Sequence, residues 1–208
     1  MVRVLPLSYN GGISINERFI TVAKSTKNTE RKAIDKVFIL LGSGAVVVLA
    51  VAGAVLWYGY NFATGMVKDQ LAAQKIYFPA ADSAAIKALD DADRKAVEKY
   101  AGQQLVDGDQ ARVYADHYIG AHLKHTAGGK TYSEVSTEAQ KDPTNAKLQA
   151  QKTTLFQGET LRGMLLGSGY AFWTFGMIAK FSAMAAFGGA LIMAVFVLLG
   201  VRHLRSLR

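Results

Sequence analysis

Two long apolar blocks constrain the fold of this chain more than any other feature of its sequence. The first covers residues 37–63 and contains no charged residue; the second covers residues 163–201 and contains only Lys180. A helix that lies against water needs a polar face, and neither block has one. Uncharged runs longer than about 18 residues are typical of membrane-spanning helices. The sequence therefore predicts an all-α integral membrane protein with two transmembrane helices.

The distribution of charge predicts the orientation of these helices. Residues 1–36 carry seven Lys/Arg against three acidic residues, and the C-terminal tail adds Arg202, Arg205 and Arg208 without an acid. The segment between the blocks is nearly neutral. Because an excess of Lys/Arg beside a span is retained in the cytoplasm, we expect both termini on the cytoplasmic side of the cell membrane.

Five parts follow from these two observations. A basic cytoplasmic tail covers residues 1–35, and the first transmembrane helix covers residues 36–63. A small helical extracytoplasmic domain is expected over residues 64–162. Residues 163–201 supply an interfacial extension and the second transmembrane helix, and residues 202–208 form a second basic tail.

The net charge of +8 has two readings. A basic balance is common in nucleic-acid-binding proteins, but here the basic residues lie beside the apolar blocks and do not interleave with aromatic residues. Attraction to anionic lipid headgroups explains them better. The lipid bilayer is therefore the expected partner, and nucleic acid is not.

Each apolar block leaves one alternative open. The first resembles a signal peptide, but its charged leader is too long for an n-region and its apolar run too long for an h-region, so an uncleaved anchor is preferred. The second is longer than one span needs. A single long helix projecting from the membrane satisfies every backbone amide, whereas a hairpin split near Lys180 would put the basic C-terminus outside.

The segment outside the membrane is expected to consist of short helices. Asp82 or Ser83 can cap a helix over residues 84–105, and Asp109 can cap a second over residues 110–125. A third is expected to start near Thr144 and to continue into the second apolar block. The expected turns and ends are a short β-prone piece at residues 75–78, a helix stop at Gly128-Gly129, a mostly irregular tail over residues 1–23, and a first helix beginning near Glu30.

Aromatic and small residues predict how the spans sit in lipid and touch other helices. Amphipathic rings and snorkelling lysines favour the headgroup level. The expected interface anchors are Trp57, Tyr58, Tyr60, Trp173 and Lys180. Small residues let helix backbones approach inside a bilayer. The expected packing positions are Gly42, Ala50, Gly53, Ala54, Ala185 and Gly189, together with a GxxxG formed by Gly163 and Gly167.

Few residues suggest chemistry, and no catalytic residue or cofactor is expected. His122 and His125 lie three apart and share a helix face, which makes them weak metal candidates; His117 points elsewhere, and Asp116 or Glu134 would have to complete the site. Histidines near a helix C-terminus are the simpler interpretation. The absence of cysteine excludes thiolate zinc sites and disulfides.

Two stretches resemble a known family. ADHYIGAHLKHTAGGKTYSEV, at residues 115–135, and TLRGMLL, before the second block, are similar to segments of a family of small actinobacterial two-span membrane proteins. Many of its members carry the description "aromatic ring-opening dioxygenase", and the resemblance covers mainly residues 65–200. It implies the same two-span topology. The described activity would imply a metal-dependent enzyme, which the histidine spacing does not favour.

By elimination, the expected function is that of a non-enzymatic accessory or scaffold subunit in a homo-oligomer or a larger complex of the cell envelope. The alternative is a sensor whose outer loop signals through the spans, with histidine as its titratable group.

Overall fold

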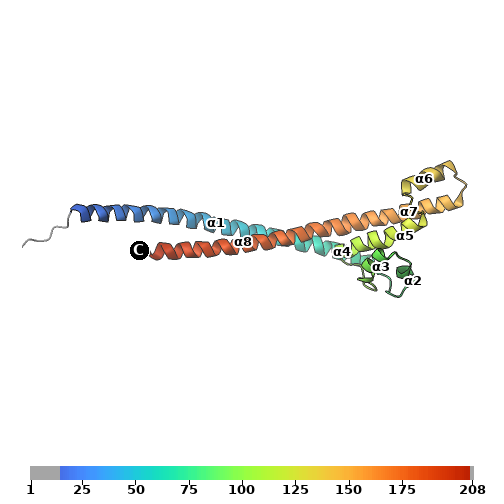
Figure 1. Ribbon diagram of the computed structural model, residues 1–208, viewed down its shortest axis with the longest axis horizontal. Coiled ribbons are helices and arrows are strands. Elements are labelled where there is room, and N and C mark those ends of the chain that lie inside the picture. Colours follow the sequence, from blue (N-terminus) through green and yellow to red (C-terminus); the bar gives the residue numbers. More distant parts are fainter. Residues whose placement is uncertain (1–14, 207–208) are drawn as a thin grey trace, which may run out of the picture. The chain divides into compact units, whose positions relative to one another are not determined.

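The computed structural model describes the backbone of residues 15–206 and the side chains of residues 29–206. Its elements are helical, and the one pairing of extended backbone among the described residues is an isolated bridge between Tyr77 and Gln104. The all-α expectation is thereby confirmed for this part of the chain (Figure 1). In chain order the elements are α1 Ile15–Ala73, α2 Ala84–Lys87, α3 Asp91–Glu98, α4 Gly108–Val113, the π-helix η1 Tyr114–Ile119, α5 Gly120–Thr126, α6 Tyr132–Lys141, α7 Ala146–Met164, the π-helix η2 Leu165–Ala171 and α8 Phe172–Ser206.

Two helical stretches are long and apolar enough to cross a membrane. They are Thr29–Ala73, within α1, and Ala146–Ser206, which joins α7, η2 and α8. Only 11% and 6% of their most apolar windows are buried inside the described chain, whereas the core helix of a soluble protein would be mostly buried. By length and composition the structure is therefore consistent with a two-span membrane protein.

The first long helix extends beyond both predicted ends. It begins at Ile15 and not near Glu30, because no glycine or proline interrupts residues 15–41. The prediction of an irregular tail is wrong for residues 15–23, and its remaining part lies outside the described residues. At the other end α1 continues to Ala73, since Val67 and Leu71 are buried in a helical domain.

The chain divides into two compact units. One comprises residues 1–52 and 186–208, and the other residues 53–185. In the described part of the first unit, the side chains of α1 and α8 meet at small residues. Gly42 lies against Val197, and the Cβ position of Gly189 is 3.5 Å from Leu49 Cδ1.

The second unit contains two apolar clusters. The larger joins α1, the loop before α2 and the helices up to η2; its buried members are Val67, Leu71, Phe78, Ile86, Leu89, Val97, Leu105, Ala111, Ala115, Ala121 and Leu165. The smaller joins α5, α6 and α7 and consists of Leu123, Ala127, Val135 and Leu155. Burial of this apolar surface stabilises a domain that has no disulfide.

The predicted helix over residues 84–105 is wrong, because the structure has two short helices there. The cap at Ser83 is confirmed, since its Oγ accepts from the Ile86 amide at 3.3 Å. The helix then breaks at Asp90, whose backbone is extended, with ψ at 154°. This break turns Leu89 into the core, where it is 3% exposed. Local periodicity does not reveal such a break, because it depends on packing against distant residues.

The next helical stretch starts two residues earlier than expected. Asp107, and not Asp109, is the N-cap: its carboxylate accepts from the Gln110 amide at 2.8 Å, and Gln110 Oε1 accepts from the Asp107 amide at 3.2 Å. This reciprocal capping box satisfies amides that the first turn leaves free. The stop at Gly128-Gly129 is confirmed, with φ values of 61° and 82° that favour glycine.

Helix α6 was not predicted, although its signal is local. Thr131 and Glu134 form a capping box, in which the Thr131 hydroxyl accepts from the Glu134 amide at 3.3 Å and Glu134 Oε2 accepts from the Thr131 amide at 2.7 Å. The sequence T-x-x-E is the usual signature of such a helix start.

This cap makes α6 sensitive to acid. The hydrogen bonds from the Thr131 amide and hydroxyl, with the nearby charge of Lys130, hold the pKa of Glu134 below its ordinary value. A lowered pKa in the folded state adds stability above the ordinary pKa that is lost as pH falls through the lowered one. We expect amide exchange in α6 to accelerate over that acidic window. The variant Glu134→Gln, which can still accept the bond, should remove this dependence; an identical acid response in both proteins would contradict the assignment.

The second long helix follows its prediction. Asn145 caps α7, its Oδ1 accepting from the Leu148 amide at 3.1 Å, next to the expected start at Thr144. Helical backbone then continues through η2 and α8 to Ser206. Lys180 lies inside α8, so the hairpin split near Lys180 is wrong.

Candidate functional site

The base of the helical domain is built on the two long helices themselves. Leu71 of α1, Ala111 of α4 and Leu165 of η2 belong to one buried cluster. Gly169 of η2 allows the closest approach, since a Cβ there would lie 3.0 Å from Ala111 Cβ and 3.8 Å from Leu71 Cδ2. A change in the packing of the domain would therefore act directly on both long helices.

Arg162 connects the two helical stretches that contain a π-helix, α4–η1–α5 and α7–η2–α8. Its Nε donates to the Ala115 carbonyl in η1 at 3.0 Å, and the same carbonyl accepts from the Gly120 amide. Its terminal nitrogens pair with Asp116 at 3.2 Å and with Glu159 at 2.9 Å. Single π-helical turns occur frequently at functional sites. Here one guanidinium ties α7 to the π-helical turn of the neighbouring stretch.

Trp173 packs into the domain against the start of α4. A Cβ on Gly108 would overlap the Cβ and ring atoms of Trp173, so glycine is required at the first position of α4. The indole Nε1 of Trp173 is buried and has no hydrogen-bond partner among the described residues. The role of Trp173 as an interface anchor stays a prediction, and its observed role is packing.

Three of the other four predicted anchors, Trp57, Tyr60 and Lys180, form one cluster, and Tyr58 lies outside it. The rings of Trp57 and Tyr60 meet edge to face at 5.5 Å, and Tyr58, which is exposed, stacks on Phe62. Lys180 Nζ lies 5.2 Å from the Tyr60 ring centroid, a cation–π arrangement. The sequence identified the residues of this cluster, but not that an aromatic ring is a partner of Lys180.

The predicted packing residues divide into two groups. Gly42 and Gly189 meet the neighbouring helix, Gly53 is buried and Ala50 is half-buried, whereas Ala54 and Ala185 are exposed. The buried small residues of the second long helix follow a seven-residue spacing that the sequence analysis missed: Gly169, Gly176, Ala183 and Ala190. This spacing is typical of helices that pack in left-handed pairs.

The histidines of the helical domain have different surroundings and contacts. His122 and His125 are exposed on α5, and His122 Nδ1 donates to the Tyr118 carbonyl at 2.7 Å. Among the described residues no three His, Cys, Asp or Glu side chains are grouped as metal ligands. Asp116 pairs with Arg162, and Glu134 caps α6, so neither completes a site with the two histidines.

Within the helical domain, His117 joins two separate elements. Its Nδ1 lies 2.7 Å from Asp93 Oδ1, which connects η1 to α3. Both side chains are partly buried. No local pattern in the sequence pairs these residues, because their contact exists only after the helices pack.

Comparison with protein families, with curated proteins and with solved structures finds no match to this chain. The resemblance to the actinobacterial family therefore stays an expectation.

Proposed function

We propose that this chain is an integral membrane protein that crosses the cell membrane twice and serves as an accessory or scaffold subunit for other membrane proteins or for copies of itself. The observation that carries the proposal is the outward apolar surface of the two long helices. Leu40 is 73% exposed, Phe38 69% and Leu191 69%. Leaving one such side chain in water forgoes roughly 1.5–3 kcal/mol, and a surrounding bilayer removes that cost.

Charge and aromatic residues support the orientation. The basic segments at both ends of the chain favour cytoplasmic termini, which puts the helical domain of residues 64–162 outside the cytoplasm. The cluster of Trp57, Tyr60 and Lys180, and the exposed ring of Tyr58, are then at the outer headgroup level, where amphipathic rings are stable.

A surface on the second long helix supports a partner-binding role. Its residues are exposed, uncharged and spaced to share one helix face; we call it the α7 face, and it comprises Phe156, Thr160, Gly163, Met164 and Gly167. Cβ positions at Gly163 and Gly167 have no atom within 4 Å. Small residues flanked by large apolar ones are the surface on which helices pack closely in and near membranes.

A sensor is the second candidate, and the pair of His117 and Asp93 favours it. Imidazole side chains titrate near neutral pH, and protonation would convert this contact into an ion pair. Because η1 is also tied to α7 by Arg162, such a change would reach a long helix. A titration of domain conformation between pH 5 and 8 distinguishes the candidates: a flat response in the wild type, or one unchanged in His117→Gln, rejects the sensor.

The scaffold proposal is tested on the full chain in membranes. We expect the protein to stay in the pellet after high-speed centrifugation, to be extracted only by detergent, and to carry a C-terminal tag that is not reachable from outside intact cells. Recovery in the supernatant would overturn the membrane assignment, and an accessible C-terminal tag would overturn the orientation.

The partner-binding role is tested by purification in mild detergent with identification of co-purifying proteins. The double variant Gly163→Leu/Gly167→Leu should lose the partner, whereas Gly65→Leu, at another helical position with nothing within 4 Å, should retain it. A wild-type monomer without a partner would contradict the scaffold role. Bound iron in the purified protein, with ring-opening activity, would instead support the dioxygenase that the resemblance implies.

A further inference from the structure

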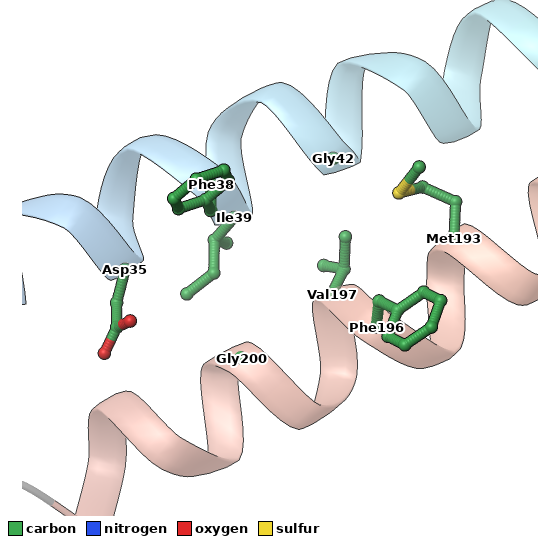
Figure 2. A pocket seen from close by; sticks show the side chains of 8 residues that line it. All are labelled: Asp35, Phe38, Ile39, Gly42, Met193, Phe196, Val197 and Gly200. Atoms are coloured by element: carbon green, nitrogen blue, oxygen red, sulfur yellow. The ribbon is translucent and has the colours of Figure 1, made fainter.

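A groove separates α1 and α8 near the basic ends of both helices, within the unit of residues 1–52 and 186–208. Its volume is about 190 Å³. Figure 2 shows the side chains that turn into the space between the two helices. We call it the inner groove; its floor and walls are Asp35, Ile39 and Gly42 of α1 and Met193, Val197 and Gly200 of α8.

The walls of the inner groove are almost entirely apolar. Phe38 and Phe196 also line it and are 69% and 63% exposed, so the groove is open to the surroundings of the helices. Water in such a space would lose hydrogen bonds, and an empty space would forgo dispersion contacts with its lining. In a membrane the surrounding fluid is hydrocarbon. An acyl chain would fill the groove without losing hydrogen bonds and would make the dispersion contacts that an empty space forgoes.

The polar end of the inner groove is occupied by a side-chain contact between the two helices. Asp35 Oδ2 lies 3.0 Å from His203 Nδ1, and the Asp35 side chain is only 23% exposed. The Asp35 carboxylate is therefore already partnered inside the protein. The groove therefore opens, at this end, onto the basic residues that follow.

Those basic residues outnumber the acids. Five lie within two turns of this contact, against Glu30 and Asp35: Arg31, Lys32, Lys36, Arg202 and Arg205. Lys32 and Arg31 lie three and four residues before Asp35, so both share its face of α1, with Lys32 half-buried and Arg31 exposed. Arg202 lies about 200° round α8 from Gly200 and therefore faces away from the inner groove. Basic pockets between membrane helices on the cytoplasmic side bind anionic lipid headgroups.

We propose that the inner groove binds one acyl chain of an anionic phospholipid of the cytoplasmic leaflet, with the lipid phosphate held by Lys32 and Arg31. The proposal rests on the membrane orientation proposed above. The apolar wall selects the chain, and the basic end selects the phosphate.

Native mass spectrometry of the full chain in an uncharged detergent tests this site. Phosphatidylglycerol, phosphatidylethanolamine and phosphatidylcholine with identical acyl chains are titrated separately. We expect phosphatidylglycerol to bind at about tenfold lower concentration than phosphatidylcholine, since each basic residue adds to the attraction of an anionic lipid.

Two pairs of variants separate the chain site from the headgroup site. Gly200→Leu should abolish the preferred binding, because a Cβ there lies 3.2 Å from Ile39 and its side chain would enter the groove. Gly188→Leu adds the same bulk to the same helix in open space and should bind like the wild type. The double variant Lys32→Gln/Arg31→Gln should remove most of the preference for phosphatidylglycerol, and Arg202→Gln, on the side of α8 that faces away from the groove, should keep more of it. Thermal unfolding of each variant in detergent checks that it is folded.

The possible results test the groove and the membrane assignment separately. Equal binding of phosphatidylglycerol by Gly200→Leu and Gly188→Leu would overturn the groove as the site, and a preference for phosphatidylethanolamine would show that Asp35 selects an ammonium instead. A chain that enters vesicles but shows no lipid preference defeats this inference alone. A chain that does not enter vesicles defeats the proposed function.

Discussion

Replacing Phe78 with alanine is expected to destabilise the helical domain by about 3–5 kcal/mol, the usual cost of removing a buried phenyl ring. Phe78 is 2% exposed, and its ring meets those of Tyr100 at 5.4 Å and Tyr114 at 5.1 Å. It also lies at the centre of the main-chain pairing, where its amide donates to the Gln103 carbonyl at 2.9 Å. Truncation would leave a cavity bounded by the two tyrosine rings.

Denaturant unfolding of the full chain in detergent, followed by tyrosine fluorescence, measures this loss. The neighbouring variant Tyr77→Ala is the control: Tyr77 is 56% exposed, and its loss should change the free energy of unfolding by no more than about 0.5 kcal/mol. Equal effects of the two variants would show that Phe78 is not in the core.

Tyr114 provides a second readout of the same variant. Its burial, and then the proximity of Tyr118, raise the pKa of Tyr114 above the ordinary value. Folding therefore favours the neutral phenol, and this contribution is present below the ordinary pKa and is lost as pH rises through the raised one. Opening a cavity beside the ring admits water, so Phe78→Ala should move the pKa of Tyr114 back toward its ordinary value in a spectrophotometric titration.

Replacing Gly108 with alanine should cost about 1–3 kcal/mol, although it adds one methyl group. The new Cβ would overlap the Cβ of Trp173, and an atom so close to the main chain cannot move by rotating a side chain. Relief requires α4 and the start of α8 to separate, which also loosens the contact between Ala111 and Gly169.

Gly163→Ala is the matched control for this overpacking. It places the same methyl group in a helix with nothing within 4 Å, and the higher helix propensity of alanine should make it neutral or stabilising by up to about 1 kcal/mol. Thermal unfolding in detergent compares the two. A Gly108→Ala protein as stable as the Gly163→Ala protein would contradict the close packing of α4 against Trp173.

Local signals predicted the parts of the fold that depend on neighbours in sequence. The two apolar blocks, the cap at Ser83, the stop at Gly128-Gly129 and the helix start beside Thr144 were all readable in this way. The capping box of Thr131 and Glu134 follows an equally local pattern, T-x-x-E, although the helix that it starts was not predicted.

The candidate sites were predictable only as residue types. Aromatic residues at the end of the first apolar block indicated an anchor cluster, but the position of Lys180 over Tyr60 depends on two helices meeting. The small residues that pack, Ala183 and Ala190, differ from the exposed Ala185 only in the side of the helix they occupy. That side is determined by the partner helix, which a single segment does not reveal.

The sequence by itself determined that the chain is helical and that two of its helices are too apolar to rest against water, because hydropathy and capping are properties of short segments. The tertiary structure alone decided that these helices continue into the domain and form its base, and that Asp93 meets His117 and Gly108 meets Trp173. Such contacts join residues far apart in the chain, and their free energy exists only once the helices pack.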